Sequence, residues 1–306
     1  MTYANDLGSQ RVSITPVDAA CGAEVRGVDL ARDLNDDLML RLTTALYEHR
    51  VLVIKDQNFD QESYRRFGQQ WGTPIRSVLA HMRLGGYPEM MAVGNTEEKD
   101  KSDEIRLGSG LWHTDQSYEK VPASATMLYS ILVPRTGGET RFADTVAAYE
   151  ALEPETQARL DTQMVSHLYG AARRREDEHA ACPLVNEEQR GNVPPCKHPL
   201  VRRHPVTGHR ALYAVGQSPY AIDGLPENEA QALLWNLREH CIQDRFVYTH
   251  KYAVGDLVIF DTFSTLHAAS PIEVVDPAED NARLLWRISV RGLPLVVQES
   301  YQKSDG

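Results

Sequence analysis

The chain has 306 residues, which is enough to bury a sizeable core in one large domain or in two ordinary ones. It carries 32 lysine and arginine residues against 43 aspartate and glutamate residues, a formal net charge of −11 at pH 7. This balance argues against a protein that grips nucleic-acid phosphates or an anionic membrane surface, but it is compatible with a local basic pocket for a small anionic substrate.

Apolar spacing predicts four helical regions, which are residues 35–49, 60–71, 145–164 and 226–240. The first two follow potential capping residues, Asn35 and Asp60, whose side chains can accept hydrogen bonds from the first turn. The third is predicted to be two short helices broken near Pro154. The fourth begins with a proline, which the first turn of a helix tolerates.

Short runs rich in β-branched and aromatic residues predict strands at residues 51–54, 90–93, 126–133, 246–252, 257–260 and 284–290. Many short strands separated by turn residues favour a mainly β sandwich or barrel with flanking helices, an α+β fold. The helices do not alternate with the strands regularly enough for a doubly wound sheet. No linker divides the chain, so we expect a single domain over residues 1–306.

Two charged stretches, residues 95–110 and 173–195, are predicted to be surface insertions near the site. They are either lids that close over a substrate, with Arg173, Arg174 and Arg175 as contacts, or solvated loops.

The cysteines, Cys21, Cys182, Cys196 and Cys241, are far apart and form no CxxC pair, so they are not a disulfide framework. The first twenty residues lack a basic start followed by an apolar stretch, and no apolar run reaches 18 residues. We therefore expect a cytoplasmic protein that neither enters nor binds a membrane.

The segment LWHTDQSY, residues 111–118, is the most informative for chemistry. In a strand, residues i and i+2 point the same way, so His113 and Asp115 would project together. They would then be two of the three ligands in the 2-His-1-carboxylate triad of non-haem Fe(II) oxygenases. Because such tripeptides are common, a third ligand is needed, and His267 is the best-placed candidate. The alternative for His267 is a buried histidine bonded to a backbone carbonyl.

Period-2 alternation in the segment RLLWRISV, residues 283–290, places Arg283 and Arg287 on one face of a strand. Arginines in so apolar a run are costly to bury unless each meets an anion. Either that face is exposed on an edge strand, or the two guanidinium groups bind carboxylates.

Several collinear motifs together resemble one known family. They are SITPVDAACGAEVRGVDLARDL and HRVLVIKDQ, then WHTDQSY and PRTGGETRFADTVAAYEAL, and finally HPLVRRHPVTGHRALY, GDLVIFDTFSTLHAA and RLLWRISV. The sequence is similar to the taurine dioxygenase / 2,4-dichlorophenoxyacetate dioxygenase family of Fe(II)- and 2-oxoglutarate-dependent oxygenases. The likeness extends along most of the chain.

The resemblance implies a double-stranded β-helix, which is a jelly-roll barrel with flanking helices. It implies that His113, Asp115 and His267 are the catalytic Fe(II) ligands. It also implies that Thr140 and Arg283 bind the distal carboxylate of the cosubstrate 2-oxoglutarate. The expected activity uses O2 to hydroxylate a C–H bond of a small, anionic substrate, and it releases succinate and CO2.

The substrate contacts implied by the resemblance are Arg287, Ser77 and His81. Ser77 stands where the taurine enzyme has a sulfonate-binding histidine, and Ser109 replaces an asparagine before the metal motif, so taurine is not the expected substrate. The interval between His267 and Arg283 is longer than in the taurine enzyme, which leaves Arg287 or Arg291 as fallback 2-oxoglutarate anchors.

Other functions remain as alternatives. The same cofactors would support desaturation or oxidative decarboxylation of an amino-acid-derived intermediate in secondary metabolism. A non-catalytic jelly-roll binding protein is a further alternative, and so is a zinc site formed by Cys196, His198, His204 and His209. Family members form dimers or tetramers, so a homodimer or homotetramer is expected.

Overall fold

The computed structural model describes residues 12–96, 110–169, 191 and 193–298. The main helices are α1 (Asp36–His49), α2 (Gln61–Trp71), α4 (Thr145–Glu150), α5 (Pro154–Leu160) and α7 (Glu227–Cys241), with short 3-10 helices η1 (Ala80–Met82) and η2 (Asp244–Phe246). The strands are β1 (Ser13–Pro16), β2 (Ala23–Arg26), β3 (Val51–Ile54), β4 (Thr73–Pro74), β5 (Arg83–Leu84), β6 (Tyr87–Gly94), β7 (Ala125–Leu132), β8 (Thr140–Asp144), β9 (Met164–His167), β10 (Cys196–Pro199), β11 (Val201–Arg203), β12 (Arg210–Leu212), β13 (Pro219–Ile222), β14 (Val247–His250), β15 (Leu257–Asp261), β16 (Thr265–Ala269) and β17 (Leu284–Arg291).

Two sheets face each other across the functional core. The large sheet has the strand order β1-β2-β3-β15-β7-β17-β6-β5, with β4 also paired to β17, and the small sheet has the order β14-β8-β16. The buried cluster between them joins Val53, Leu128 and Leu285 of the large sheet to Phe142 of the small one. The mainly β expectation is therefore confirmed, and the two sheets remain separate rather than closing into one barrel.

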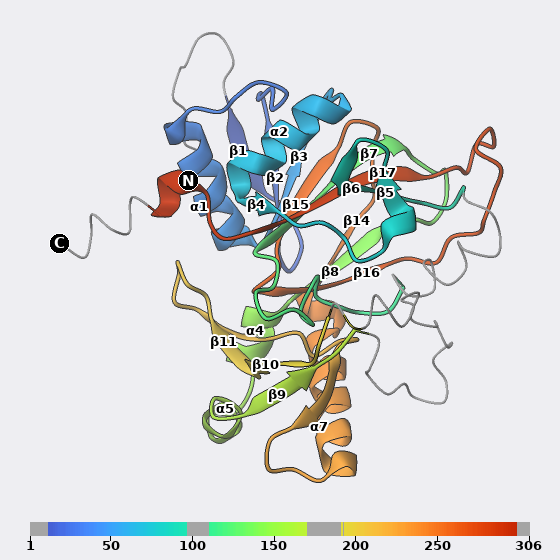
Figure 1. The fold of residues 1–306 in the computed structure, drawn as a ribbon. Coiled ribbons are helices and arrows are strands. Elements are labelled where there is room, and N and C mark those ends of the chain that lie inside the picture. The colour runs from blue at the N-terminus through green and yellow to red at the C-terminus, as the bar shows by residue number, and fades with distance from the viewer. Residues whose placement is uncertain (1–11, 97–109, 170–190, 192, 299–306) are drawn as a thin grey trace.

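Helices α1 and α2 lie together on the outer face of the large sheet (Figure 1). Both begin where the sequence predicted, because their capping side chains satisfy free N–H groups of the first turn. Asn35 accepts from the backbone N–H of Leu38, and Asp60 forms a reciprocal capping box with Ser63. Their apolar faces pack against the outward-pointing residues of β7, β15 and β17.

A second layer covers the outer face of the small sheet, and it contains α4, α5, α7 and the β9, β10 and β11 strands (Figure 1). The predicted break at Pro154 is confirmed, since that proline begins α5. The predicted helical region extended too far, because Met164 already starts β9. Likewise Phe246 ends a 3-10 helix, and the strand predicted over residues 246–252 covers Val247–His250.

Most of the charged stretches at residues 95–110 and 173–195 lie outside the described residues, and so do Arg173, Arg174 and Arg175. Within the part of the chain that the structure describes, no helix combines the length and the apolar character needed to cross a membrane.

A buried histidine in the second layer is expected to make the free energy of unfolding fall as the pH is lowered. His167 is fully buried, and its Nδ1 lies 2.8 Å from Oγ of Ser218. Its Nε2 has no hydrogen-bond partner among the residues that the structure describes. Burial lowers the pKa of His167 to about 3. The folded protein therefore resists a proton that the unfolded chain accepts.

We predict that His167→Asn reduces the loss of stability on acidification. As the pH falls below about 6.5, the unfolded state gains a proton that folded His167 refuses, and stability falls by about 1.4 kcal/mol per pH unit. Between pH 7 and pH 5 the wild type should lose about 2 kcal/mol more than the variant, measured by urea unfolding. Asparagine retains a polar atom near Ser218. Equal losses for the two proteins would show that His167 is not the sensitive group.

Candidate metal centre

The two predicted histidine ligands are joined directly by their backbones. His113 and His267 form an isolated antiparallel bridge, in which each backbone N–H donates to the other's carbonyl at 2.9 Å. His267 lies within β16 of the small sheet, whereas Asp115 lies in the turn that follows His113. The prediction that His113 and Asp115 share one strand is wrong, because His113 is paired in a β-bridge whereas Asp115 lies in a turn.

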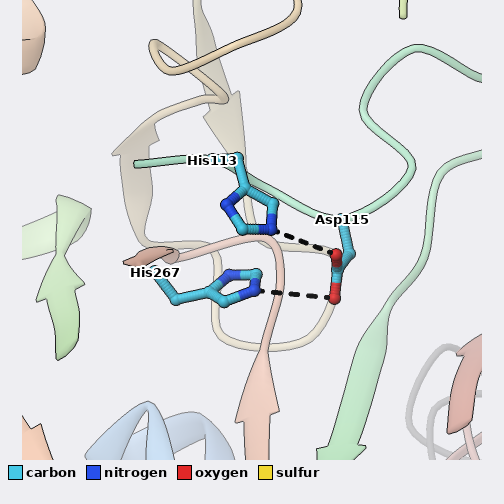
Figure 2. A group of neighbouring side chains, drawn as sticks. All are labelled: His113, Asp115 and His267. Carbon is cyan, nitrogen blue, oxygen red and sulfur yellow. Dashed lines mark ion pairs between the residues drawn. The ribbon is translucent and has the colours of Figure 1, made fainter. Parts of the chain in front are cut away.

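The three predicted ligands nevertheless meet at one point, as Figure 2 shows. His113 Nε2 lies 3.7 Å from Asp115 Oδ1, and His267 Nε2 lies 3.9 Å from Asp115 Oδ2. One ion can span such distances, because each ligand atom lies about 2 Å from its metal. Two imidazole nitrogens and one carboxylate are also the donor set that suits non-haem Fe(II).

The protonation states of these residues suit metal binding. Nδ1 of His113 lies 2.8 Å from the carbonyl oxygen of Leu111, so it donates there and leaves the Nε2 lone pair on the side of Asp115. Burial lowers the pKa of His113 and lowers that of His267 further, since the two rings are adjacent. Both imidazoles are therefore neutral, which is the form that binds metals.

Asp115 is held ionised by its surroundings. Burial alone would raise the pKa of this carboxyl group, but the positive charge of Arg287, together with the hydrogen bond from Thr126, outweighs it and holds the pKa well below its usual range. Arg287 Nη2 lies 2.7 Å from Oδ1, and Thr126 Oγ1 donates to Oδ2 at 2.8 Å. The carboxylate thus has a fixed orientation toward the two histidines.

Within the described residues no other group of three histidine, cysteine or acidic side chains comes this close together. The alternative zinc site is therefore wrong. Cys196 Sγ lies 3.5 Å from His198 Nε2, but His204 faces Asp261 and His209 faces Glu150.

Arg283 occupies a second buried position, directly before the start of β17. It is 5% exposed, and its Nε donates to the carbonyl of Gly138 at 3.0 Å. Its guanidinium lies 5.7 Å from the ring of Tyr252, whose hydroxyl lies 3.0 Å from Oγ1 of Thr140. No carboxylate among the described residues pairs with Arg283, and burial lowers its pKa. A buried guanidinium without an acid needs an external anion, so this position fits a carboxylate ligand.

The edge-strand alternative for these arginines is wrong. Strand β17 is interior to the large sheet, since β7 pairs with one edge and β6 and β4 pair with the other. The Gly-Gly turn before Thr140 explains how Arg283 fits. Gly138 has a φ of 73°, and a Cβ there would lie 2.9 Å from the Arg283 side chain.

Of the remaining predicted residues, those that the structure describes have contacts with other groups. Ser77 is buried, but its backbone carbonyl accepts hydrogen bonds from Arg83. His81 belongs to η1, and its side chain is outside the described part of the structure, as is Ser109. Arg291 forms an ion pair with Glu119, so it is not a fallback anchor for a cosubstrate.

Sequence reasoning missed Thr126, Tyr252 and Arg83. Thr126 begins a predicted strand, but a hydroxyl there gives no sign that it reaches Asp115. Tyr252 ends another predicted strand, and only the fold brings it to Thr140.

Comparison with known proteins adds independent information. A family model described as "Taurine catabolism dioxygenase TauD, TfdA family" matches residues 13–289. An (S)-phenoxypropionate/alpha-ketoglutarate-dioxygenase from Sphingobium herbicidovorans is 32% identical over 293 residues, which cover 94% of this chain and 97% of the relative. An alpha-ketoglutarate-dependent 2,4-dichlorophenoxyacetate dioxygenase from Cupriavidus pinatubonensis is 30% identical over 266 residues, covering 84% of this chain and 91% of the relative.

A solved structure described as AAD-2 in complex with Mn(II) and N-oxalylglycine superposes with a TM-score of 0.81. The likeness covers 92% of this chain and 98% of that one, at 28% identity. The predicted jelly-roll fold is thereby confirmed.

We predict that Thr126→Val weakens Mn(II) binding by roughly 10- to 100-fold, because hydrogen bonds that orient a metal ligand typically contribute that much. Thr126→Ser keeps the hydroxyl and should bind Mn(II) nearly as the wild type does, in calorimetric titrations. Thr262→Val is a matched control, since it removes a buried hydroxyl that donates to the Ala123 carbonyl. An unchanged affinity of Thr126→Val for Mn(II) would show that Thr126 does not contribute to metal binding.

Proposed function

The chain belongs to the TauD, TfdA family of dioxygenases, and on that premise we propose that it hydroxylates a C–H bond of a small organic anion. It is a 2-oxoglutarate-dependent non-haem iron dioxygenase, and its cofactors are Fe(II), 2-oxoglutarate and O2. The expectations of family, enzyme class and cofactors are thus confirmed. The non-catalytic alternative has no support.

One observation carries the proposal for the site. The two-histidine, one-carboxylate cluster and the buried Arg283, which pairs with no carboxylate among the described residues, both border the core between the sheets, since His267 contacts Phe142 and Arg283 contacts Tyr252. In the proposed enzyme His113, Asp115 and His267 hold the iron, and Arg283 and Thr140 hold the distal carboxylate of 2-oxoglutarate. When bound, iron supplies the activation of dioxygen, which is coupled to the conversion of 2-oxoglutarate into succinate and CO2.

The protein's own groups supply orientation and exclusion of water. Arg283 fixes one end of the cosubstrate, because a buried guanidinium binds a carboxylate strongly and directionally. The apolar residues of the core between the sheets, among them Leu285 and Phe142, keep water from the reacting groups. Arg287, Ser77 and His81 are proposed to contact the substrate, and Arg287 also keeps Asp115 ionised.

Hydroxylation is proposed as the outcome, with an organic acid as substrate. Support comes from relatives that are named for phenoxypropionate and 2,4-dichlorophenoxyacetate, both of which are carboxylates. Desaturation or oxidative decarboxylation of an amino-acid-derived intermediate is the second candidate. We further propose that the enzyme works in the cytoplasm as a single-domain homodimer or homotetramer.

The proposed function is tested by succinate release. Purified protein with Fe(II), 2-oxoglutarate and O2 should release succinate when a panel of small carboxylates, sulfate esters and amino acids is supplied. His267→Ala should abolish this release, because it removes an iron ligand. A wild type that releases no succinate with any compound, and none without substrate, would refute the proposal.

We predict that Arg283→Gln raises the KM for 2-oxoglutarate about 10- to 100-fold, since a hydrogen bond to a charged group contributes about 1.5–3 kcal/mol. The same variant should weaken N-oxalylglycine binding to the Mn(II) form by a similar factor in calorimetric titration. Arg291→Gln, which removes an equal charge at the pair with Glu119, should change neither value. Equal KM values for 2-oxoglutarate in the wild type and in Arg283→Gln would show that Arg283 does not bind the cosubstrate.

A further inference from the structure

One row of residues crosses three strands on the inner face of the large sheet. Arg83 of β5 pairs with Met91 of β6, and Met91 pairs on its other side with Arg287 of β17. Directly paired residues in neighbouring strands point to the same face. Arg287 Nη1 lies 3.5 Å from Met91 Sδ, which confirms this for two of the three.

The shared face is the one that carries the metal centre. Met90, the neighbour of Met91, points outward and belongs to the core beneath α1 and α2. Met91 therefore points inward, as does Leu128, the residue of β7 that continues the row beyond Arg287. Strands lie about 4.8 Å apart, so the Cα atoms of Arg83 and Arg287 are separated by about 10 Å.

Arg83 has no acidic partner in the described part of the chain. Its side chain is half-buried, and its Nε and Nη2 both donate to the backbone carbonyl of Ser77. Burial lowers the pKa of Arg83, and so does the nearby cation Arg76. Arg287 differs, because Asp115 already matches its charge at 2.7 Å.

The segment around Ser77, which Arg83 contacts through the Ser77 carbonyl, begins beside β17, the strand that contains Arg287. The backbone N–H of Ile75 donates to the carbonyl of Ser289 on β17 at 2.8 Å, and buried Ser77 follows two residues later. Arg83, on the edge strand β5, therefore fixes the position of Ser77 through these hydrogen bonds. The pairing across β6 places the side chain of Arg83 on the same inner face of the sheet as Arg287. A partly buried cation on that face, with no carboxylate partner among the described residues, is suited to bind the anionic group of a ligand.

We infer that Arg83 is a second substrate-binding arginine, which takes the acidic group of an organic acid at the β5 edge of the large sheet. This inference rests on the proposed function and adds a residue that determines specificity. The acidic group of the substrate binds at the edge strand. The rest of the substrate extends past Met91, so that the carbon to be oxidised lies near His113, Asp115 and His267. Arg287 keeps its charge for Asp115 and orients the substrate beside it.

The test compares acids with uncharged analogues of the same shape. Binding to the Mn(II) and N-oxalylglycine form is measured by calorimetry for 2,4-dichlorophenoxyacetate, phenoxypropionate and an alkyl sulfate, and for the amides of the two carboxylates. Arg83→Gln should weaken binding of the acid that the wild type prefers by about 10-fold or more, since it removes a charge-assisted hydrogen bond. Amide binding should change less than threefold, so the preference for acid over amide falls.

Two further variants separate charge from structure. Arg83→Lys keeps the charge and should recover part of the preference for acid, whereas a role confined to holding Ser77 would weaken acid and amide equally. Arg65→Gln removes an equal charge on α2, where Arg65 pairs with Glu62, and should leave binding unchanged. In assays of succinate release, Arg83→Gln should raise the KM for the preferred acid by the same factor as its binding weakens, with kcat nearly unchanged.

The outcomes distinguish this inference from the proposed function. If the wild type binds an acid and Arg83→Gln binds it equally well, the assignment of Arg83 is overturned while the dioxygenase function stands. If the wild type binds none of the acids, the organic-acid class is overturned as well. If acids bind through Arg83 but no succinate is released, the binding site stands and the proposed function fails.

Discussion

Two arginines determine how this site is built: Arg283, which is buried directly before β17, and Arg287, which is partly buried within it. β17 is an interior strand of the large sheet, and the alternation of side chains along it and in the residue before it places Arg283 and Arg287 on the face toward the candidate metal ligands. A buried cation is stable only beside an anion. Arg287 meets that condition with Asp115, which belongs to the chain, and Arg283 has no such carboxylate among the described residues. The first pair builds the metal centre, and the second position depends on a ligand.

The metal centre follows from the first pair. Because Arg287 stabilises the charged form of Asp115, the carboxylate can lie in a dry interior beside two neutral imidazoles. The backbone bridge between His113 and His267 fixes those imidazoles relative to each other, although they come from distant parts of the chain. The overall charge of −11 describes the whole chain and says nothing of this interior, where positive groups outnumber Asp115. Surface charge and site charge are separate properties of this protein.

Much of this arrangement could be predicted from the sequence, because local signals carry it. Caps at Asn35 and Asp60 set the starts of α1 and α2, and strict alternation after Arg283 sorted the two faces of β17. What local signals could not supply was pairing between distant segments. The short β8 and β16 strands carry Thr140 and His267, but they have weak patterns of their own and are stabilised by pairing with each other. Asp115 lies in a turn whose course depends on contacts with Thr126 and Arg287, so a strand rule failed there. The row from Arg83 to Arg287 spans three strands, and β5 has only two residues.

β17 and β5, which both border the proposed active site, also differ in how well they can tolerate substitutions. β17 is a shared wall, since Leu285 faces the site while Trp286 and Ile288 face the helical layer. A substitution on that wall would change the proposed iron centre, the proposed cosubstrate anchor and the core together. β5 is an edge strand joined to the sheet on one side by β6, and it lies away from the bulk of the core. On the proposed role of Arg83, substitutions in this edge strand would change which substrates bind while the residues of the proposed iron centre stay the same.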